Sequence, residues 1–316
     1  ISGSNPSDRS LVDEPKSRNA RTTASVEPVE LTPWSATRLN AIFRNVQEQA
    51  NSRSVGEARR ALREALGDWD ATMLKAETGR HYPPYWQGLD TATQVVFANL
   101  LRDLPDNEIA IDLAIDDDRD ATRACFALSD HPGIFSRLAG ALALVGANVV
   151  DARTYTSKDG YATAVFWIQD GDGAPYEAER LPRLRQMIHK TLKGEIKTTE
   201  AIKSRDKIKK RERAFRVPTS ITFDNEGSEI YTIIEVDTRD RPGLLFDLAR
   251  ILYQCNVNIT AARVATFGER ASDVFYVQDL FGEKLQSPAR MSRIRQAVAK
   301  AIDAPIETHT DAPKVA

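Results

Sequence analysis

The chain has 316 residues, of which 41% are hydrophobic, 28% charged and 7% aromatic, a composition typical of globular proteins with two or three domains. Its 43 lysines and arginines are balanced by 45 aspartates and glutamates, so the net charge of −2 offers no broad positive surface to nucleic acid or to a membrane. No apolar run approaches the roughly 18 residues that a spanning helix needs, and no signal peptide is recognisable. Cys125 and Cys255 lie far apart among apolar residues, which favours two buried free thiols of a cytoplasmic protein over a disulfide.

The first third of the chain divides into two parts. Residues 1–33 are polar and aperiodic, which predicts a disordered tail. Residues 34–106 place apolar side chains at helical spacing and predict a small helical region. Within it, Arg80–Trp86 combines a histidine, two prolines and three aromatic side chains. We interpret this segment as a packed corner between helices, the alternative being a platform on which a ligand stacks.

After Asp106 the periodicity changes from helical to alternating. Ile109–Ile115 predict a half-buried strand, and the acidic run Asp116–Asp118 predicts a solvated turn. From there the chain repeats itself. Residues 122–153 match residues 232–263 at an offset of 110, and beyond one shorter loop Val165–Asp170 matches Val274–Asp279 at an offset of 109. Agreement of this density indicates two copies of one structural module.

Each copy reads as strand, helix, strand, strand, helix. A fourth strand is expected at residues 195–200 of the first copy and is poorly defined in the second. This order is typical of the ferredoxin-like βαββαβ plan, with helices on one face of an antiparallel sheet. We therefore predict an α+β fold with a first module at residues 107–202, a basic connector and extra strand at 203–229, and a second module at 230–316. Because sheet edges are prone to pairing, the two modules should pair within or between chains.

An Asp-x-Pro-Gly motif precedes the first helix of each copy, as Asp130–Gly133 and Asp240–Gly243. Proline presets the helical backbone angle, glycine permits close approach, and the exposed amides of the first helical turn attract a carboxylate. The aspartate could hold an ammonium group, and an asparagine that begins the next strand offers both a donor and an acceptor. Together these groups suit a free α-amino acid. The alternative is purely structural: the aspartate caps the helix, and the asparagine starts its strand in a left-handed conformation.

The two motifs, each followed some fifteen residues later by Asn-Val or Asn-Ile, resemble ACT domains. Three segments, Arg80–Asp90, Val217–Asn225 and Gly268–Gly282, more specifically resemble the C-terminal half of the bifunctional PII uridylyltransferase/uridylyl-removing enzymes. The resemblance covers about residues 57 to 303. It implies a cytoplasmic nitrogen sensor in which L-glutamine binds the ACT modules, suppresses UMP transfer to the PII signal protein and stimulates UMP removal. The effector-binding residues that it implies are Asp130, Gly133, Ile134 and Asn148 in the first copy, and Asp240, Gly243, Leu244 and Asn258 in the second.

The chain departs from that family in its catalytic motifs. Magnesium is expected for the full-length enzyme, whose transferase site needs a Gly-Ser turn followed by Asp-x-Asp carboxylates. No Gly-Ser here is followed by such a pair, and none of the four histidines precedes an aspartate as the uridylyl-removing metal site requires. We therefore predict a regulatory region without catalytic residues, metal or cofactor, inactive on its own. The alternatives are a free-standing ACT-repeat binding protein and, less well matched, the sensor tail of an alarmone synthetase/hydrolase.

Overall fold

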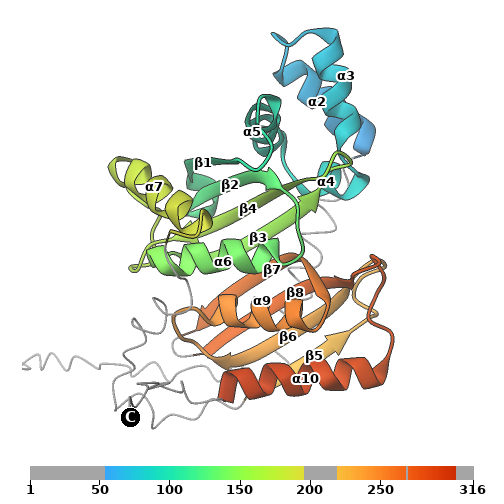
Figure 1. Cartoon of the computed structure of the whole chain (residues 1–316), viewed down its shortest axis with the longest axis vertical. Coiled ribbons are helices and arrows are strands. Elements are labelled where there is room, and N and C mark those ends of the chain that lie inside the picture. The colour runs from blue at the N-terminus through green and yellow to red at the C-terminus, as the bar shows by residue number, and fades with distance from the viewer. Residues whose placement is uncertain (1–53, 196–218, 268–269, 304–316) are drawn as a thin grey trace, which may run out of the picture. The chain divides into compact units, whose positions relative to one another are not determined.

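The computed structural model describes residues 54–195, 219–267 and 270–303, all within one compact unit of the chain (Figure 1). The predicted tail at 1–33, the start of the helical region, the strand expected at 195–200 and most of the basic connector lie outside the described residues.

Four helices occupy the described part of the helical region. They are α2 (Val55–Ala65), α3 (Ala71–Arg80), α4 (Pro83–Gly88) and α5 (Thr91–Arg102). Three begin at side-chain caps that satisfy first-turn amides: Ser54 in a capping box with Glu57, Asp70, and Asp90. Proline in the first turn of α4 has the backbone angle that a helix start requires.

The two sequence repeats form two modules of the same plan. The first repeat contains β1 (Ile109–Asp116), β2 (Ala121–Ser129), α6 (Ile134–Val145), β3 (Asn148–Thr156), β4 (Tyr161–Gln169) and α7 (Leu181–Leu192). The second contains β5 (Ser220–Asp224), β6 (Thr232–Arg239), α9 (Leu244–Gln254), β7 (Val257–Phe267), β8 (Arg270–Asp279) and α10 (Pro288–Asp303). Short 3-10 turns at Asp117–Arg119 and Ala178–Arg180 complete the first module. The predicted α+β fold with two tandem ferredoxin-like modules is confirmed.

The eight strands of the described residues belong to one antiparallel sheet in the order β1-β2-β4-β3-β7-β8-β6-β5. The modules therefore pair edge to edge within the chain, through β3 and β7. One detail of the predicted βαββαβ order is corrected. The outer strand of each module, β1 or β5, precedes the module core, so the order along the chain is ββαββα. The sheet edge beside the first strand of the module core can be filled by a strand that comes before the core or by one that follows it. Here the preceding segment forms that edge strand.

Alternation along the strands separates two apolar layers in the first module. In β2, Ala124 and Phe126 face the main core beneath the module helices, whereas Ala121 and Cys125 face the other side of the sheet. That second side is covered by α2, α4 and α5, whose apolar residues form one cluster with Val165 and Trp167. The helical region is thus joined to the first module by burial of apolar surface.

Both cysteines are free thiols, Cys125 buried and Cys255 half-buried. Among the described helices, none combines the length and apolarity that crossing a membrane would require.

Candidate functional site

The Asp-x-Pro-Gly loop has the same geometry in both repeats. Gly133 and Gly243 hold the left-handed angles φ 83° and φ 78° immediately before α6 and α9, and no side chain caps either helix. Asp130 instead accepts a hydrogen bond of 2.7 Å from the hydroxyl of Thr156, and Asp240 accepts the equivalent bond of 3.4 Å from Thr266. The aspartates therefore do not cap the helices, and this part of the structural alternative is wrong. The first amide of each helix is already used, because Ile134 donates to the carbonyl of His131 (3.2 Å) and Leu244 donates to that of Arg241 (3.1 Å). The amides available to a ligand are therefore the following ones of the first turn.

The asparagines meet these aspartates across the seam between the repeats. At the seam Ala152 pairs with Ala262, its own counterpart, so the two repeats are related by an approximate twofold axis at this point. Beyond that pair the hydroxyl of Thr154 donates to the carbonyl oxygens of Ile259 (3.0 Å) and Thr260 (3.2 Å). Asn258, two residues before Thr260 on β7, lines one cavity with Thr156, which holds Asp130. Asn148 and Thr266, the threonine that holds Asp240, are the counterparts of Asn258 and Thr156 at the offset of 110.

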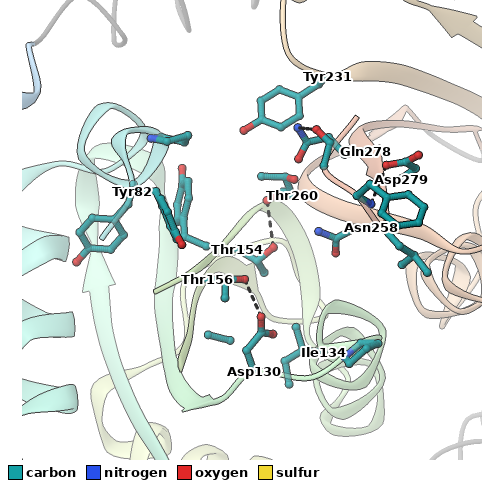
Figure 2. A pocket seen from close by; sticks show the side chains of 18 of the residues that line it. Tyr82, Asp130, Ile134, Thr154, Thr156, Tyr231, Asn258, Thr260, Gln278 and Asp279 are labelled. Atoms are coloured by element: carbon teal, nitrogen blue, oxygen red, sulfur yellow. Dashed lines mark hydrogen bonds between the residues drawn. The ribbon is translucent and has the colours of Figure 1, made fainter. Parts of the chain in front are cut away.

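One such position opens into a cavity of about 690 Å³, shown in Figure 2. The first repeat contributes Asp130 and Ile134 from the loop and Thr154 and Thr156 from the end of β3. The second repeat contributes Asn258 and Thr260 from β7, Gln278 from β8, Tyr231 and the turn at 279–282. In Figure 2 Asp130 and Ile134 lie across from Gln278 and Asp279, and Thr154 and Thr260 lie side by side between them. A volume of this size is in the ordinary range for a small-molecule site.

The expected site residues are therefore brought together across the repeats and not within each repeat. Asp130 and Ile134 share the cavity with Asn258, and Gly133 lines a smaller adjoining hollow that also contains Asn258. This corrects the expectation that each aspartate works with the asparagine of its own module. The reason is that the start of each second strand lies across the seam, opposite the other repeat's loop. Asp240, Gly243, Leu244 and Asn148 occupy the positions related to these by the approximate twofold axis.

The Arg80–Trp86 segment is a packed corner, as predicted. His81 is fully buried and stacks on Tyr85, with ring centroids 3.6 Å apart and planes 10° from parallel. Its neighbour Tyr82 nevertheless lines the cavity, together with Pro84 and Tyr85. The helical region thus forms a third wall of the site, at the segment for which a ligand platform was the alternative.

Other lining residues were also missed. Thr156 carried a detectable signal, because the offset of 110 places a threonine at the same position in both repeats. The repeat gave no such signal for Tyr231, Leu280 and Phe281. The first repeat has different residues at the corresponding positions, namely Ala121, Gly171 and Asp172.

Three titratable groups that line the cavity have shifted pKa values. Burial raises the pKa of the Tyr231 and Tyr85 hydroxyls above the usual tyrosine range, so both remain protonated hydrogen-bond donors at neutral pH. Backbone amides, first that of Glu283 and then that of Phe281, lower the pKa of Asp279 and hold it as a carboxylate within its turn. Within the described ranges, no three His, Cys, Asp or Glu side chains are grouped closely enough to hold a metal ion. The arrangement can recognise a small ligand that carries both a cationic and an anionic group.

Comparisons with known proteins identify the family. Residues 228–304 match the model described as the ACR family N-terminal ACT domain. A bifunctional uridylyltransferase/uridylyl-removing enzyme from Ruegeria pomeroyi is 60% identical over 281 residues, which cover 85% of this chain and 31% of that protein. The enzyme of the same description from Cereibacter sphaeroides is 59% identical, with 85% and 30% covered, and that from Azospirillum brasilense is 37% identical, with 89% and 32% covered.

The chain spans about a third of the length of these relatives. The match nevertheless extends over most of the chain, across the helical region and both modules. With its tandem ACT modules and this similarity, the chain belongs to the bifunctional uridylyltransferase/uridylyl-removing enzyme family, as its C-terminal regulatory region.

Proposed function

We propose that the cavity binds a free α-amino acid, L-glutamine, and that its occupancy regulates the enzyme to which this region belongs. The observation that carries the proposal is the meeting of Asp130 and Asn258, from different repeats, at one cavity beside the uncapped start of α6.

Each part of the ligand has a complementary group. The ammonium group would bind Asp130, whose carboxylate Thr156 already orients through the 2.7 Å hydrogen bond. The α-carboxylate would accept hydrogen bonds from amides at the start of α6, where the helix dipole favours negative charge. The side-chain amide would be read by Asn258, whose own amide offers both a donor and an acceptor.

In the whole enzyme, we propose that glutamine suppresses UMP transfer to the PII signal protein and stimulates UMP removal, in the cytoplasm. Magnesium would serve the transferase site elsewhere in that enzyme, and the ACT region itself would bind its effector without a metal. Because this chain has neither the Gly-Ser turn followed by Asp-x-Asp nor the His-Asp pair of the two catalytic sites, we expect it to show neither activity alone. Measurable UMP transfer by the purified chain would contradict this assignment.

Calorimetric titration of the chain with each of the twenty amino acids tests the effector. L-Glutamine should bind, and Asp130→Ala should weaken it about ten- to a hundredfold, since a charged hydrogen bond in a dehydrated site is worth about 1.5–3 kcal/mol. Asp240→Ala is the matched control, because it removes the same side chain from the loop of the other repeat. Neither aspartate caps a helix, so both variants should remain folded.

Two results would refute the proposal. One is that the wild-type chain binds none of the twenty amino acids. The other is that Asp130→Ala and Asp240→Ala leave the affinity for L-glutamine unchanged, in which case the ligand site lies elsewhere.

A further inference from the structure

The turn that follows the last strand of each module has the same backbone structure in both repeats. In the second repeat the Asp279 carboxylate accepts hydrogen bonds from the amides of Phe281 (2.8 Å) and Glu283 (3.0 Å). In the first repeat the Asp170 carboxylate accepts from the amides two and four residues later, at 2.9 Å and 3.2 Å. Each turn also contains a glycine in the left-handed region, with φ 82° at Gly282 and φ 79° at Gly173. The two turns are therefore equivalent supports for different side chains.

The side chains that they present differ in kind. The first repeat carries Gly171 and Asp172 where the second carries Leu280 and Phe281. Leu280 is 58% exposed and Phe281 is 91% exposed, although removing a large apolar side chain from water is favourable. The backbone hydrogen bonds of the turn hold both side chains in this exposed position.

Both exposed side chains lie at the cavity. Leu280 and Phe281 line it from the second repeat, and Tyr82, itself 52% exposed, lines it from α4. Figure 2 shows Tyr82 on the opposite side of the cavity from Gln278 and Asp279, the residues that lead into the turn. An apolar surface that borders a polar recognition site is suited to cover the aliphatic part of a bound ligand.

We infer that Leu280 and Phe281 form a specificity wall that covers the side chain of the bound amino acid and selects for aliphatic length. The inference rests on the proposed function. The polar elements, aspartate, threonine and asparagine, are present at both twofold-related positions, so they cannot distinguish the two positions. The apolar wall can distinguish the two positions, because the corresponding turn of the first repeat has Gly171 and Asp172 in place of Leu280 and Phe281. Ligands with two or more side-chain methylenes should therefore prefer the position built from Asp130 and Asn258.

Substitution of Phe281 tests the wall. Phe281→Asp installs the residue type of the other repeat's turn, and Asp172→Ala alters that other turn as the matched control. Each methylene removed from water contributes severalfold to affinity, so Phe281→Asp should weaken L-glutamine binding about tenfold. It should weaken L-serine, which has a single side-chain carbon, far less, so the preference for glutamine over serine should narrow. Asp172→Ala should leave both affinities unchanged. Because Phe281 is exposed, its replacement should not alter the thermal unfolding temperature.

A second variant reports contact directly. In Phe281→Trp, saturating L-glutamine should shift the added tryptophan's emission, taken as the difference from wild type, to shorter wavelength. Unchanged glutamine affinity and selectivity in Phe281→Asp, with no spectral shift in Phe281→Trp, would overturn the wall while leaving the proposed function intact. Failure of the wild-type chain to bind any amino acid would instead contradict the proposed function and the wall together.

Discussion

Replacing Asp273 by asparagine should stabilise the second repeat, and by a margin that widens as the pH rises. Asp273 lies on β8, facing the module core, and only 1% of its surface is exposed. Among the described residues, neither of its carboxylate oxygens has a hydrogen-bond partner. The first repeat has Ala164 at this position, so the module plan itself does not require a carboxyl there.

The sign follows from the pKa of this carboxyl. Burial raises the pKa of Asp273 well above the ordinary aspartate value, and the nearby Asp240 and Asp237 raise it further. The folded protein therefore holds this proton more tightly than the unfolded chain does. The contribution of this carboxyl to folding stability is fully present below its unfolded pKa of about 3.9. That contribution is lost as the pH rises through the folded pKa. Asparagine has the same shape but cannot ionise, so it escapes this loss. Asparagine leaves an unpaired polar side chain at the same buried place, so its gain comes from the avoided ionisation alone. Between the unfolded and the folded pKa of Asp273, we expect that gain to grow by about 1.4 kcal/mol for each pH unit.

Urea unfolding followed by circular dichroism, repeated from about pH 5 to about pH 8, measures this gain. Asp103→Asn is the control, because it makes the same substitution at a side chain that is 82% exposed. The reasoning is refuted if the unfolding free energies of wild type and Asp273→Asn run parallel across this pH range.

Two further predictions concern packing at the loop and the reactivity of the thiols. In Gly133→Ala the new Cβ would lie 3.2 Å from three ring atoms of Tyr253 and would adopt φ 83°, so we expect a loss of at least the roughly 1–2 kcal/mol of a left-handed residue. Gly243→Ala should lose only the backbone part, because Ala143 stands at the position of Tyr253 in the other repeat; equal urea midpoints for the two variants would contradict this account. Iodoacetamide should modify the half-buried Cys255 before Cys125, since burial removes Cys125 from solvent and raises its pKa to about 12. Mass spectrometry of the intact chain checks the order, and early labelling of Cys125 would show that its cluster opens readily.

The sequence predicted those features that are encoded locally. The first helix of each copy was predicted directly after its Asp-x-Pro-Gly motif, and α6 begins at Ile134, immediately after Gly133. The internal repeat then predicted the second module from the first. The aspartates and asparagines also reach the expected kind of place, at a loop and at a strand start.

The remainder depends on contacts between distant segments. Which asparagine meets which aspartate is decided by the pairing of β3 with β7, and no local pattern specifies the partner of an edge strand. Tyr82 reaches the cavity only because α4 packs beside the first module. The edge strand of each module, β1 or β5, could have preceded or followed the module core along the chain, because a segment from either end of the core can reach the same sheet edge.

The seam itself has a thermodynamic consequence. Only three residue pairs join β3 to β7, whereas eight join β1 to β2, so the backbone contributes least cohesion where the two repeats meet. If the repeats separate as partly independent units, separation begins there, because local opening follows the fewest hydrogen bonds. A ligand held by Asp130 on one side and Asn258 on the other spans that boundary, and separation would break its contacts. Its binding free energy is then added to the work of parting the repeats. An effector of modest affinity would in this way reinforce the boundary where strand pairing is shortest, in addition to the apolar core that α6 and α9 share across it.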